Sequence, residues 1–454
     1  MILPPYRKLS LILKYDRIRL AKILGNDVGY LQHKVGIAVM LHTFLILLAV
    51  LALLSIVLEE VTHINKAKTT LFLGCVAWIT LFIASGSPEN SKLVAKELNE
   101  NLLEIATLWL FLMSTMTFVA YLNAKGMIQV LVQKIFPQQV SVRMLMIQVG
   151  MFSLVLSTFC DNVTATLVSL GLLTTFNLDK QMRRRMAVLI IFAVNSGGVA
   201  LITGDVTTLM IFLADKVHIS ELLVLFIPAG ISVMLLAILF SLKAEGHVST
   251  TPIEQNYNTV DIVIGLIFFT TIIMTMVLNV LFGIPPVLTF LAGLSVMFLV
   301  GRTSKSKTEE IQVLEYIRQV EFDTLLFFLG ILLLVGMLKE IGTLHLLTEV
   351  YGMYNPNISN FFTGVGSALL DNVPLTAALL KADPILTTAQ WLGLTYSVGV
   401  GGSLLVIGSA SGIIAMSKVE ELTFVSYLKY VPALLLCYCL GYGLTLFLAN
   451  HIHG

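Results

Sequence analysis

Long apolar stretches alternate with short polar segments along most of this chain. Each stretch approaches the ~20 residues that a helix needs to cross the hydrocarbon core of a bilayer. The pattern therefore predicts an all-α polytopic membrane protein. The expected complete spans are residues 36–58, 70–84, 103–122, 222–242, 262–281, 287–300, 322–338 and 424–448, with a short amphipathic piece at 126–135.

Composition agrees with this prediction and narrows the function. The chain is 57% hydrophobic and 12% charged, whereas soluble domains carry about 25% charged residues. A net charge of +1 argues against nucleic acid as a partner. The four cysteines lie in apolar segments without zinc-ligand spacing, so a disulfide framework is not expected. We find no phosphate-binding glycine loop and no hydrolase motif. An enzyme is therefore not expected, and an ion gradient must drive any active transport.

Two polar segments interrupt the apolar regions and share one pattern. Residues 157–166 read Ser-Thr-Phe-Cys-Asp-Asn-Val-Thr-Ala-Thr, and residues 367–376 read Ser-Ala-Leu-Leu-Asp-Asn-Val-Pro-Leu-Thr. The apolar arms that flank each Asp-Asn pair are too short to span a bilayer comfortably. Re-entrant hairpins with polar tips are therefore expected at 144–176 and 361–380. Such backbone is tolerated at membrane depth only inside protein or beside water.

A helix interrupted by glycines follows each hairpin, at 188–213 and at 392–416. The two breaks share a Gly-Gly-x5-Gly pattern, although Ser409 stands where the first break has Asp205. Unwound helix centres free carbonyl and hydroxyl oxygens that can coordinate a cation. Close helix packing through small residues is the alternative explanation. The break glycines are Gly197, Gly198, Gly204, Gly401, Gly402 and Gly408.

Each half of the chain thus contains three helices, a hairpin, a broken helix and a final helix. Five spans separate the two hairpins. Because five is odd, the hairpins must enter from opposite faces, which predicts an inverted repeat of the kind used for alternating access. The expected divisions are a basic tail at 1–35, a first repeat at 36–242, a linker at 243–257 and a second repeat at 258–454.

Oxygen-bearing side chains gather at the hairpin tips and helix breaks. Hard cations such as sodium prefer oxygen ligands. A carboxyl group removed from water is harder to ionise, so near neutral pH it can hold either a proton or a cation, and that competition is sufficient for antiport. Capping of the hairpin arms is the alternative role for Asp161 and Asp371. The candidate ion-binding residues are Asp161, Asn162, Thr166, Asn195, Asp205, Thr207, Thr208, Asp371, Asn372, Thr376 and Ser403.

With these motifs, the chain resembles the NhaD-type sodium/proton antiporters of the ion transporter superfamily over about residues 40–450. The resemblance rests on residues 58–63, 161–164, 204–210, 321–328, 371–374 and 399–409. It implies two hairpins and two broken helices around a sodium site. Its ligands would be Asp161, Asn162, Asp371 and Asn372.

The resemblance also implies a function. A multi-pass protein of the cytoplasmic (inner) membrane would export sodium or lithium in exchange for external protons, with no cofactor other than the transported ion. The bilayer is its surroundings, and a homodimer is left open. Glu104 stands where similar antiporters carry a glutamate, which suggests a proton path, although an interfacial charge fits equally well. Rival functions are an arsenite or antimonite permease and a sodium-coupled dicarboxylate symporter.

Overall fold

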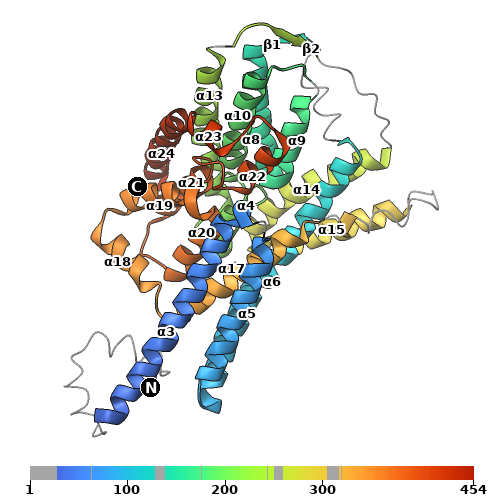
Figure 1. The fold of residues 1–454 in the computed structure, drawn as a ribbon. Coiled ribbons are helices and arrows are strands. Elements are labelled where there is room, and N and C mark those ends of the chain that lie inside the picture. The colour runs from blue at the N-terminus through green and yellow to red at the C-terminus, as the bar shows by residue number, and fades with distance from the viewer. Residues whose placement is uncertain are drawn as a thin grey trace. The chain divides into compact units, whose positions relative to one another are not determined.

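The computed structural model describes residues 28–62, 64–127, 139–174, 176–242, 244–249, 259–303, 316–318 and 320–453. Most of the predicted basic tail and of the amphipathic piece at 126–135 lies outside these residues. Within them, eight helices are long and apolar enough to cross a membrane. Apart from one short strand pair, the regular elements of the described chain are helical (Figure 1). This confirms the prediction of an all-α polytopic membrane protein.

The chain forms two compact units, and each takes residues from both halves of the sequence. Unit 1 takes its described residues from 1–106, 322–353 and 377–385, and unit 2 takes its described residues from 107–321, 354–376 and 386–454. In unit 1, α3 (Val28–Val57) and α17 (Phe322–Glu340) both pack on α5 (Lys66–Ala84) (Figure 1). Also here are α4 (Glu59–Thr62), α18 (His345–Met353) and the first part of α6 (Pro88–Ala124).

Helices α5 and α17 approach closely because glycines face each other. A Cβ built on Gly330 would lie 2.3 Å from the backbone nitrogen of Leu71, and one on Gly74 would lie 2.9 Å from the carbonyl oxygen of Gly330. The Trp78 indole Nε1 donates to the carbonyl oxygen of Leu333 at 2.8 Å. Small residues that let backbones meet are typical of helix pairs in membranes.

Unit 2 holds both predicted hairpins and both broken helices. The first hairpin is α8 (Val142–Phe159) with α9 (Asn162–Thr174), and the second is α19 (Pro356–Leu370) with α20 (Asn372–Ala382), whose last residues belong to unit 1. The first broken helix is α10 (Lys180–Gly198) with α11 (Val206–Leu213), and the second is α21 (Thr388–Gly401) with α22 (Ala410–Lys418). The remaining elements are β1 (Gln139–Ser141), α12 (Ile219–Leu222), η1 (Leu223–Leu225), α13 (Phe226–Ser241), β2 (His247–Ser249), α14 (Thr259–Phe282), α15 (Pro286–Thr303), α23 (Phe424–Leu428) and α24 (Val431–His453).

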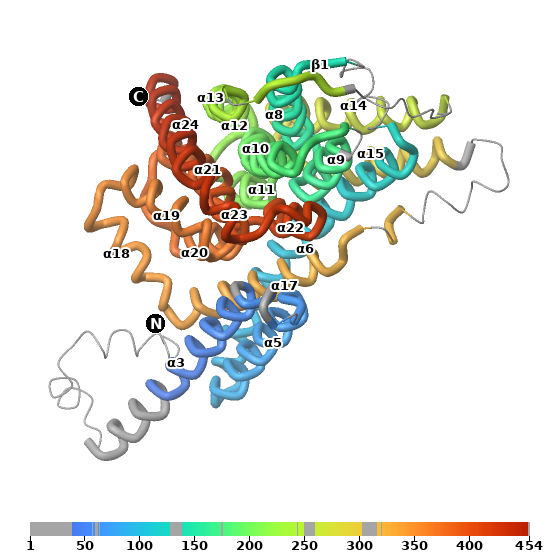
Figure 2. The backbone as a smooth tube through the Cα atoms, turned by 45° about the horizontal axis from the view of Figure 1, so that its top comes forward, coloured from blue at the N-terminus to red at the C-terminus, as the bar shows by residue number. Residues whose placement is uncertain are grey.

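Corresponding elements of unit 2 make corresponding contacts. Helix α10 packs against α8 and α13, just as α21 packs against α19 and α24. The corresponding helices also meet each other, because α10 contacts α21 and α13 contacts α24. Figure 2 shows α9, the second arm of the first hairpin, beside α22 of the second broken helix. The hairpins and helix breaks are therefore where the sequence predicts them.

Some element boundaries differ from the prediction. The third span is a helix that begins at Pro88 rather than residue 103, because the polar residues before the apolar core are also helical. The last span begins at Val431, after the separate α23, with Pro432 in its first turn. Proline is accommodated there because a first-turn N–H has no helical partner. Helix α18 and the antiparallel pair β1–β2 were not expected.

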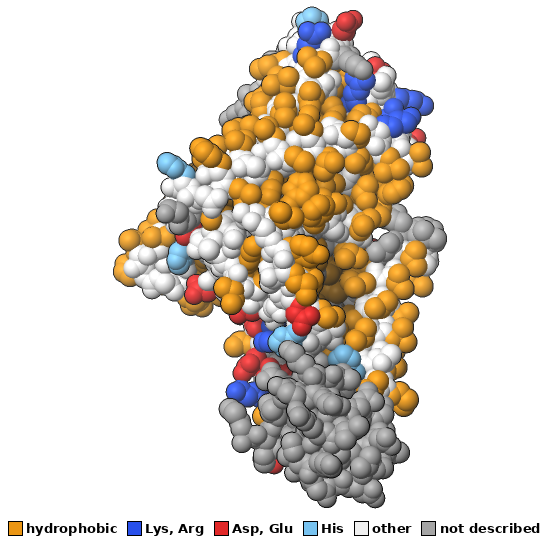
Figure 3. Space-filling model, turned by 90° about the vertical axis from the view of Figure 1, so that its left-hand side faces the viewer, with side chains coloured by type: hydrophobic (Ala, Val, Ile, Leu, Met, Phe, Trp, Pro, Cys, Tyr) orange, Lys and Arg blue, Asp and Glu red, His pale blue; other side chains and the backbone are white. Residues whose placement is uncertain are grey.

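The surface suits a lipid environment. Large apolar side chains are exposed on several helices, including Phe72 at 67%, Ile83 at 79% and Phe282 at 70%. Hydrophobic side chains predominate on the face drawn in Figure 3. In water such patches would be a liability, whereas lipid tails cover them at no cost.

Candidate functional site

One buried carboxylate joins both hairpin tips in unit 2. Asp205 lies at the break between α10 and α11, with 6% of its surface exposed. Its Oδ2 accepts a hydrogen bond from Asn162 Nδ2 at 2.9 Å and another from Asn372 Nδ2 at 3.0 Å. Its Oδ1 accepts from the backbone nitrogen of Thr207 at 3.0 Å, which caps α11. The arrangement brings together three segments that are far apart in the sequence.

The first hairpin tip is tied together by short-range hydrogen bonds. Asp161 accepts from the backbone nitrogen of Thr164 at 2.9 Å and from its hydroxyl at 2.8 Å. The Ser157 hydroxyl donates to Asn162 Oδ1 at 2.8 Å. Asp161 therefore caps α9, as the alternative interpretation proposed, while its neighbour Asn162 reaches the carboxylate of Asp205. Ser157 and Thr164 are supporting residues that the list of candidate ligands lacked.

The second tip holds its aspartate in an unusual backbone conformation. Asp371 has φ 68° and ψ 150°, a region that L-residues rarely adopt. Its Oδ1 accepts from the backbone nitrogen of Asn372 at 2.7 Å. Such conformations persist only where the surroundings enforce them, and they concentrate at ligand sites and switches.

The break glycines are contact points between hairpin and broken helix. A Cβ built on Gly197 would lie 2.1 Å from the carbonyl oxygen of Leu154, and one on Gly401 would lie 2.1 Å from that of Gly364. Gly204 is similarly close to the carbonyl oxygen of Ser157, at 2.6 Å. These distances leave no room for any side chain. The packing explanation thus accounts for the glycines, and their packing partner is the hairpin that carries the tip.

We expect Gly197→Ala and Gly401→Ala each to abolish most transport, because a methyl group would push the hairpin arm away from the broken helix. Gly230→Ala in α13 and Gly443→Ala in α24 are matched controls, since a Cβ there meets no atom within 4 Å. Ion flux into everted vesicles, normalised to the inserted protein by immunoblot, measures the effect. Wild-type flux in both break variants would show that the hairpin contact is dispensable.

A second polar contact crosses between the broken helices. Asn195 of α10 is fully buried, and its Nδ2 donates to Ser409 Oγ at 3.1 Å and to the carbonyl oxygen of Ile191 at 2.8 Å. Within the described residues, four buried oxygens near the breaks have no hydrogen-bond partner. They are Asn195 Oδ1, Ser196 Oγ, Thr207 Oγ1 and Ser411 Oγ. Unpartnered buried oxygens are few in native proteins, so these four distinguish the breaks from an ordinary apolar core.

The other candidate ligands are engaged with backbone. The hydroxyls of Thr166 and Thr376 donate to the carbonyl oxygens of Asn162 and Asn372, one helical turn earlier. Because a hydroxyl oxygen keeps two lone pairs, these bonds do not exclude a cation.

Two further candidates close the helix breaks. Thr208 donates to the carbonyl oxygen of Gly198 at 3.2 Å, and Ser403 donates to that of Val400 at 2.6 Å. The first bond runs from α11 back to the last residue of α10, and the second runs from the break back to the end of α21. These hydroxyls therefore stabilise the unwound conformation.

Glu104 lies in unit 1, where it forms an ion pair with Lys381 at the end of α20. The Glu104 side chain is 61% exposed and that of Lys381 is 13% exposed. The pair connects the end of α20 to α6.

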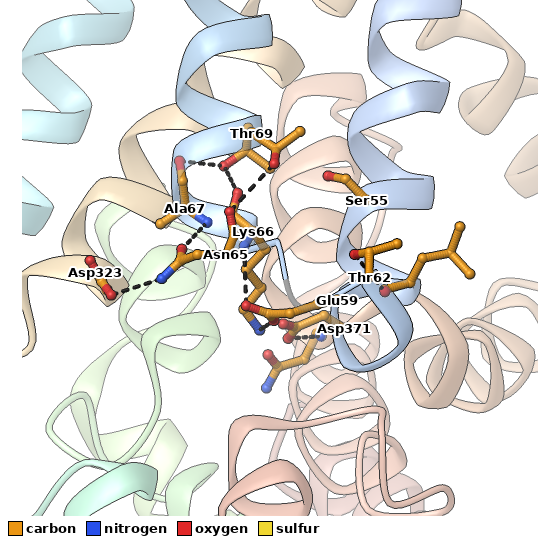
Figure 4. Close-up of polar contacts among 12 residues, drawn as sticks. Ser55, Glu59, Thr62, Asn65, Lys66, Ala67, Thr69, Asp323 and Asp371 are labelled. Carbon is orange, nitrogen blue, oxygen red and sulfur yellow. Dashed lines mark hydrogen bonds and ion pairs between the residues drawn. The ribbon is translucent and has the colours of Figure 1, made fainter.

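A polar cluster in unit 1 connects the start of α5 to two segments that carried the sequence resemblance, 58–63 and 321–328. Asn65 caps α5 through Oδ1, which accepts from the backbone nitrogen of Ala67 at 2.8 Å. Its Nδ2 donates to Asp323 Oδ2 in the first turn of α17 at 2.8 Å (Figure 4). Glu59 Oε1 accepts from the backbone nitrogen of Lys66 at 3.1 Å, and its carboxylate lies 3.7 Å from the Lys66 ammonium. No pattern in the sequence indicates that these segments meet.

A multi-pass bundle with two hairpins and two broken helices around a buried carboxylate has the architecture of a secondary transporter. The chain belongs to the citrate transporter (CitMHS) family, whose model matches residues 37–399.

Individual relatives agree with this class. A sequence called Na(+)/H(+) antiporter NhaD from Alkalimonas amylolytica is 30% identical, with 86% of this chain and 87% of the relative aligned. Another of that name from Vibrio parahaemolyticus is 30% identical over 82% of this chain and 98% of the relative. The resemblance to NhaD-type proteins is therefore confirmed.

The crystal structure of the Alcanivorax borkumensis YdaH transporter, described as having an unusual topology, matches with a TM-score of 0.54 at 12% identity. It covers 81% of this chain and 90% of that one, which supports the fold alone.

Proposed function

We propose that this protein is a secondary antiporter that exports sodium or lithium ions in exchange for external protons across the cytoplasmic membrane. The observation that carries the proposal is the carboxylate of Asp205, which binds the amides of both hairpin tips. The relatives named sodium/proton antiporters over most of the chain point the same way. The proposal is one of transport rather than enzymatic catalysis, with no cofactor beyond the transported ion.

The proposed ligand set centres on Asp205. An ionised carboxylate offers about four lone-pair positions, and three are occupied by Thr207 N, Asn162 Nδ2 and Asn372 Nδ2. Rotation of the two amides would present their oxygens, instead of their nitrogens, to a cation beside the carboxylate. Asp161 and Asp371 are proposed to supply further negative charge at the hairpin tips.

Exchange follows from competition for the same oxygens. When Asp205 is protonated, the site loses the charged ligand at its centre, and the donor amides lose one acceptor. When it is ionised, sodium can bind. A transporter that changes conformation only with one of these occupants bound exchanges the two species and leaks neither.

Anionic substrates fit the site poorly. The family description names citrate, and arsenite permeases and dicarboxylate symporters were the rival predictions. Three aspartates at the tips and break, Asp161, Asp205 and Asp371, would repel a tricarboxylate or dicarboxylate. The hairpin tips read Asp-Asn-Val, where a dicarboxylate symporter should show Ser-Asn-Thr. Sodium, lithium and protons are therefore the proposed substrates.

The experiment that tests this function uses everted membrane vesicles and a fluorescent pH dye. After respiration acidifies the lumen, sodium or lithium should dequench the dye within seconds, whereas potassium, arsenite, succinate and citrate should not. Vesicles with no transporter provide the background. If citrate or succinate dequenched the dye and sodium and lithium did not, the antiporter proposal would be refuted in favour of an anion transporter.

We also propose that the two halves form inverted repeats, as the number of spans and the corresponding contacts of unit 2 suggest. Cysteines at Lys180, the first residue of α10, and at Leu386, before α21, should then react with an impermeant thiol reagent from opposite sides of the membrane. The exposed native cysteines Cys75 and Cys439 are first replaced. Labelling of both positions from one side would exclude the inverted arrangement.

A further inference from the structure

The two broken helices share a framework but differ at one capping residue. Asp205 caps α11, and Ser409 caps α22, where its Oγ accepts from the backbone nitrogen of Gly412 at 3.4 Å. Both have extended backbone, with φ of −139° and −152° respectively. One capping position is therefore charged and the other is neutral.

The hairpin amides are distributed unequally between these two positions. Asn162 and Asn372 occupy equivalent places in the two hairpins, yet both donate to Asp205 Oδ2. An equal arrangement would give each capping residue the amide of one hairpin. Hydrogen bonds to an ionised acceptor are roughly twice as strong as those between neutral groups. The carboxylate thus accounts for the recruitment of both amides to one side.

The neutral capping residue Ser409 is paired with Asn195 rather than with a hairpin amide. Its Nδ2 donates to Ser409 Oγ at 3.1 Å from the opposite broken helix. The corresponding position in α21 is Gly399, where a Cβ would lie 2.4 Å from Val199 Cγ1. Because the side chain of Val199, the residue after α10, fills the space beside Gly399, an amide side chain at this position would require Val199 to move.

We infer that Asp205 alone decides which of two equivalent capping positions binds the cation, and that Asn195 is a positioning residue that fills the neutral one. This inference rests on the proposed function. It assigns Asn195, predicted from sequence as an ion ligand, to the support of Ser409. It also means that a carboxylate moved from 205 to 409 should recruit the hairpin amides and rebuild a cation site there.

The test is a transplant of the carboxylate. Asp205→Ser should abolish exchange and the sodium-dependent rise in melting temperature of the purified protein. Asp205→Ser/Ser409→Asp should regain both, with an apparent sodium constant within about tenfold of wild type, the effect of one imperfect hydrogen bond. Asp205→Ser/Ser411→Asp is the matched control, because it adds the same charge to another buried hydroxyl position of α22. That control should stay inactive.

Three results would overturn the inference. The first is a well-folded transplant that neither exchanges nor responds to sodium, and the second is equal rescue by the Ser411→Asp control. The third comes from single variants and is informative even when the transplant does not fold. Asn372→Ala should raise the sodium constant at least about tenfold, and Asn195→Ala, which removes one neutral hydrogen bond, less than about fivefold. If both variants raised the sodium constant equally, Asn195 would be an ion ligand rather than a positioning residue. Absence of any sodium response in the wild type would instead refute the proposed function.

Discussion

Asp205→Asn is expected to abolish sodium/proton exchange while the protein remains inserted in the membrane. The substitution keeps the size of the side chain but presents an NH₂ group where one acceptor oxygen stood. Asn162 and Asn372 both donate to one oxygen of Asp205. An NH₂ group in place of that oxygen would face two donors and accept neither hydrogen bond. A hydrogen bond to a charged group contributes about 1.5–3 kcal/mol, so losing one lowers a rate by roughly tenfold to 100-fold. Loss of the titratable proton removes the exchange itself.

The matched comparison is Ser409→Ala, the equivalent position of the other broken helix. It removes one neutral hydrogen bond with Asn195 and a cap on α22. Each contributes about 1 kcal/mol, so a moderate loss of rate and stability is expected. Dye dequenching at several pH values, with immunoblots of the vesicles, measures both variants. If Asp205→Asn exchanged at the rate of Ser409→Ala, the carboxylate would have no special role.

Polar residues within apolar sequence made the hairpins and breaks predictable. An Asp-Asn pair at membrane depth is costly unless its surroundings compensate it. Such pairs are therefore rare in apolar sequence and are easily recognised where they occur. The same signal identified Asp205, Asn162 and Asn372 individually. Their convergence on one oxygen could not be predicted, because hydrogen bonds between distant segments leave no periodic pattern.

Other elements lacked a signal in hydropathy. Helix α6 begins fifteen residues before its apolar core, in polar sequence that looks like a loop. The start of α5 and the start of α17 are joined by Asn65 and Asp323, which appear in the sequence as ordinary polar flanks. The compact units also cross the sequence order, which spacing along the chain does not reveal.

The last prediction separates capping from ion binding at the hairpin tips. Asp161→Asn should retain the cap on α9, because asparagine accepts the same bond from the Thr164 backbone as well as aspartate does. Asp371→Asn should retain the backbone, because asparagine has the shape of aspartate and its Oδ1 can accept the same bond from the Asn372 backbone nitrogen. Both variants should therefore express and insert like the wild type. What they lose is the negative charge.

If these carboxylates help to bind the ion, each Asn variant should lose most exchange, with the melting temperature in the absence of sodium nearly unchanged. Asp→Glu at either position should leave weak activity with a shifted pH profile and a higher sodium constant, because the charge stays while its position changes. Asp161→Ala is the control for capping, since it removes the cap and should lower stability by about 1 kcal/mol. Near wild-type exchange in both Asn variants would make Asp161 and Asp371 structural caps and leave Asp205 as the proton carrier.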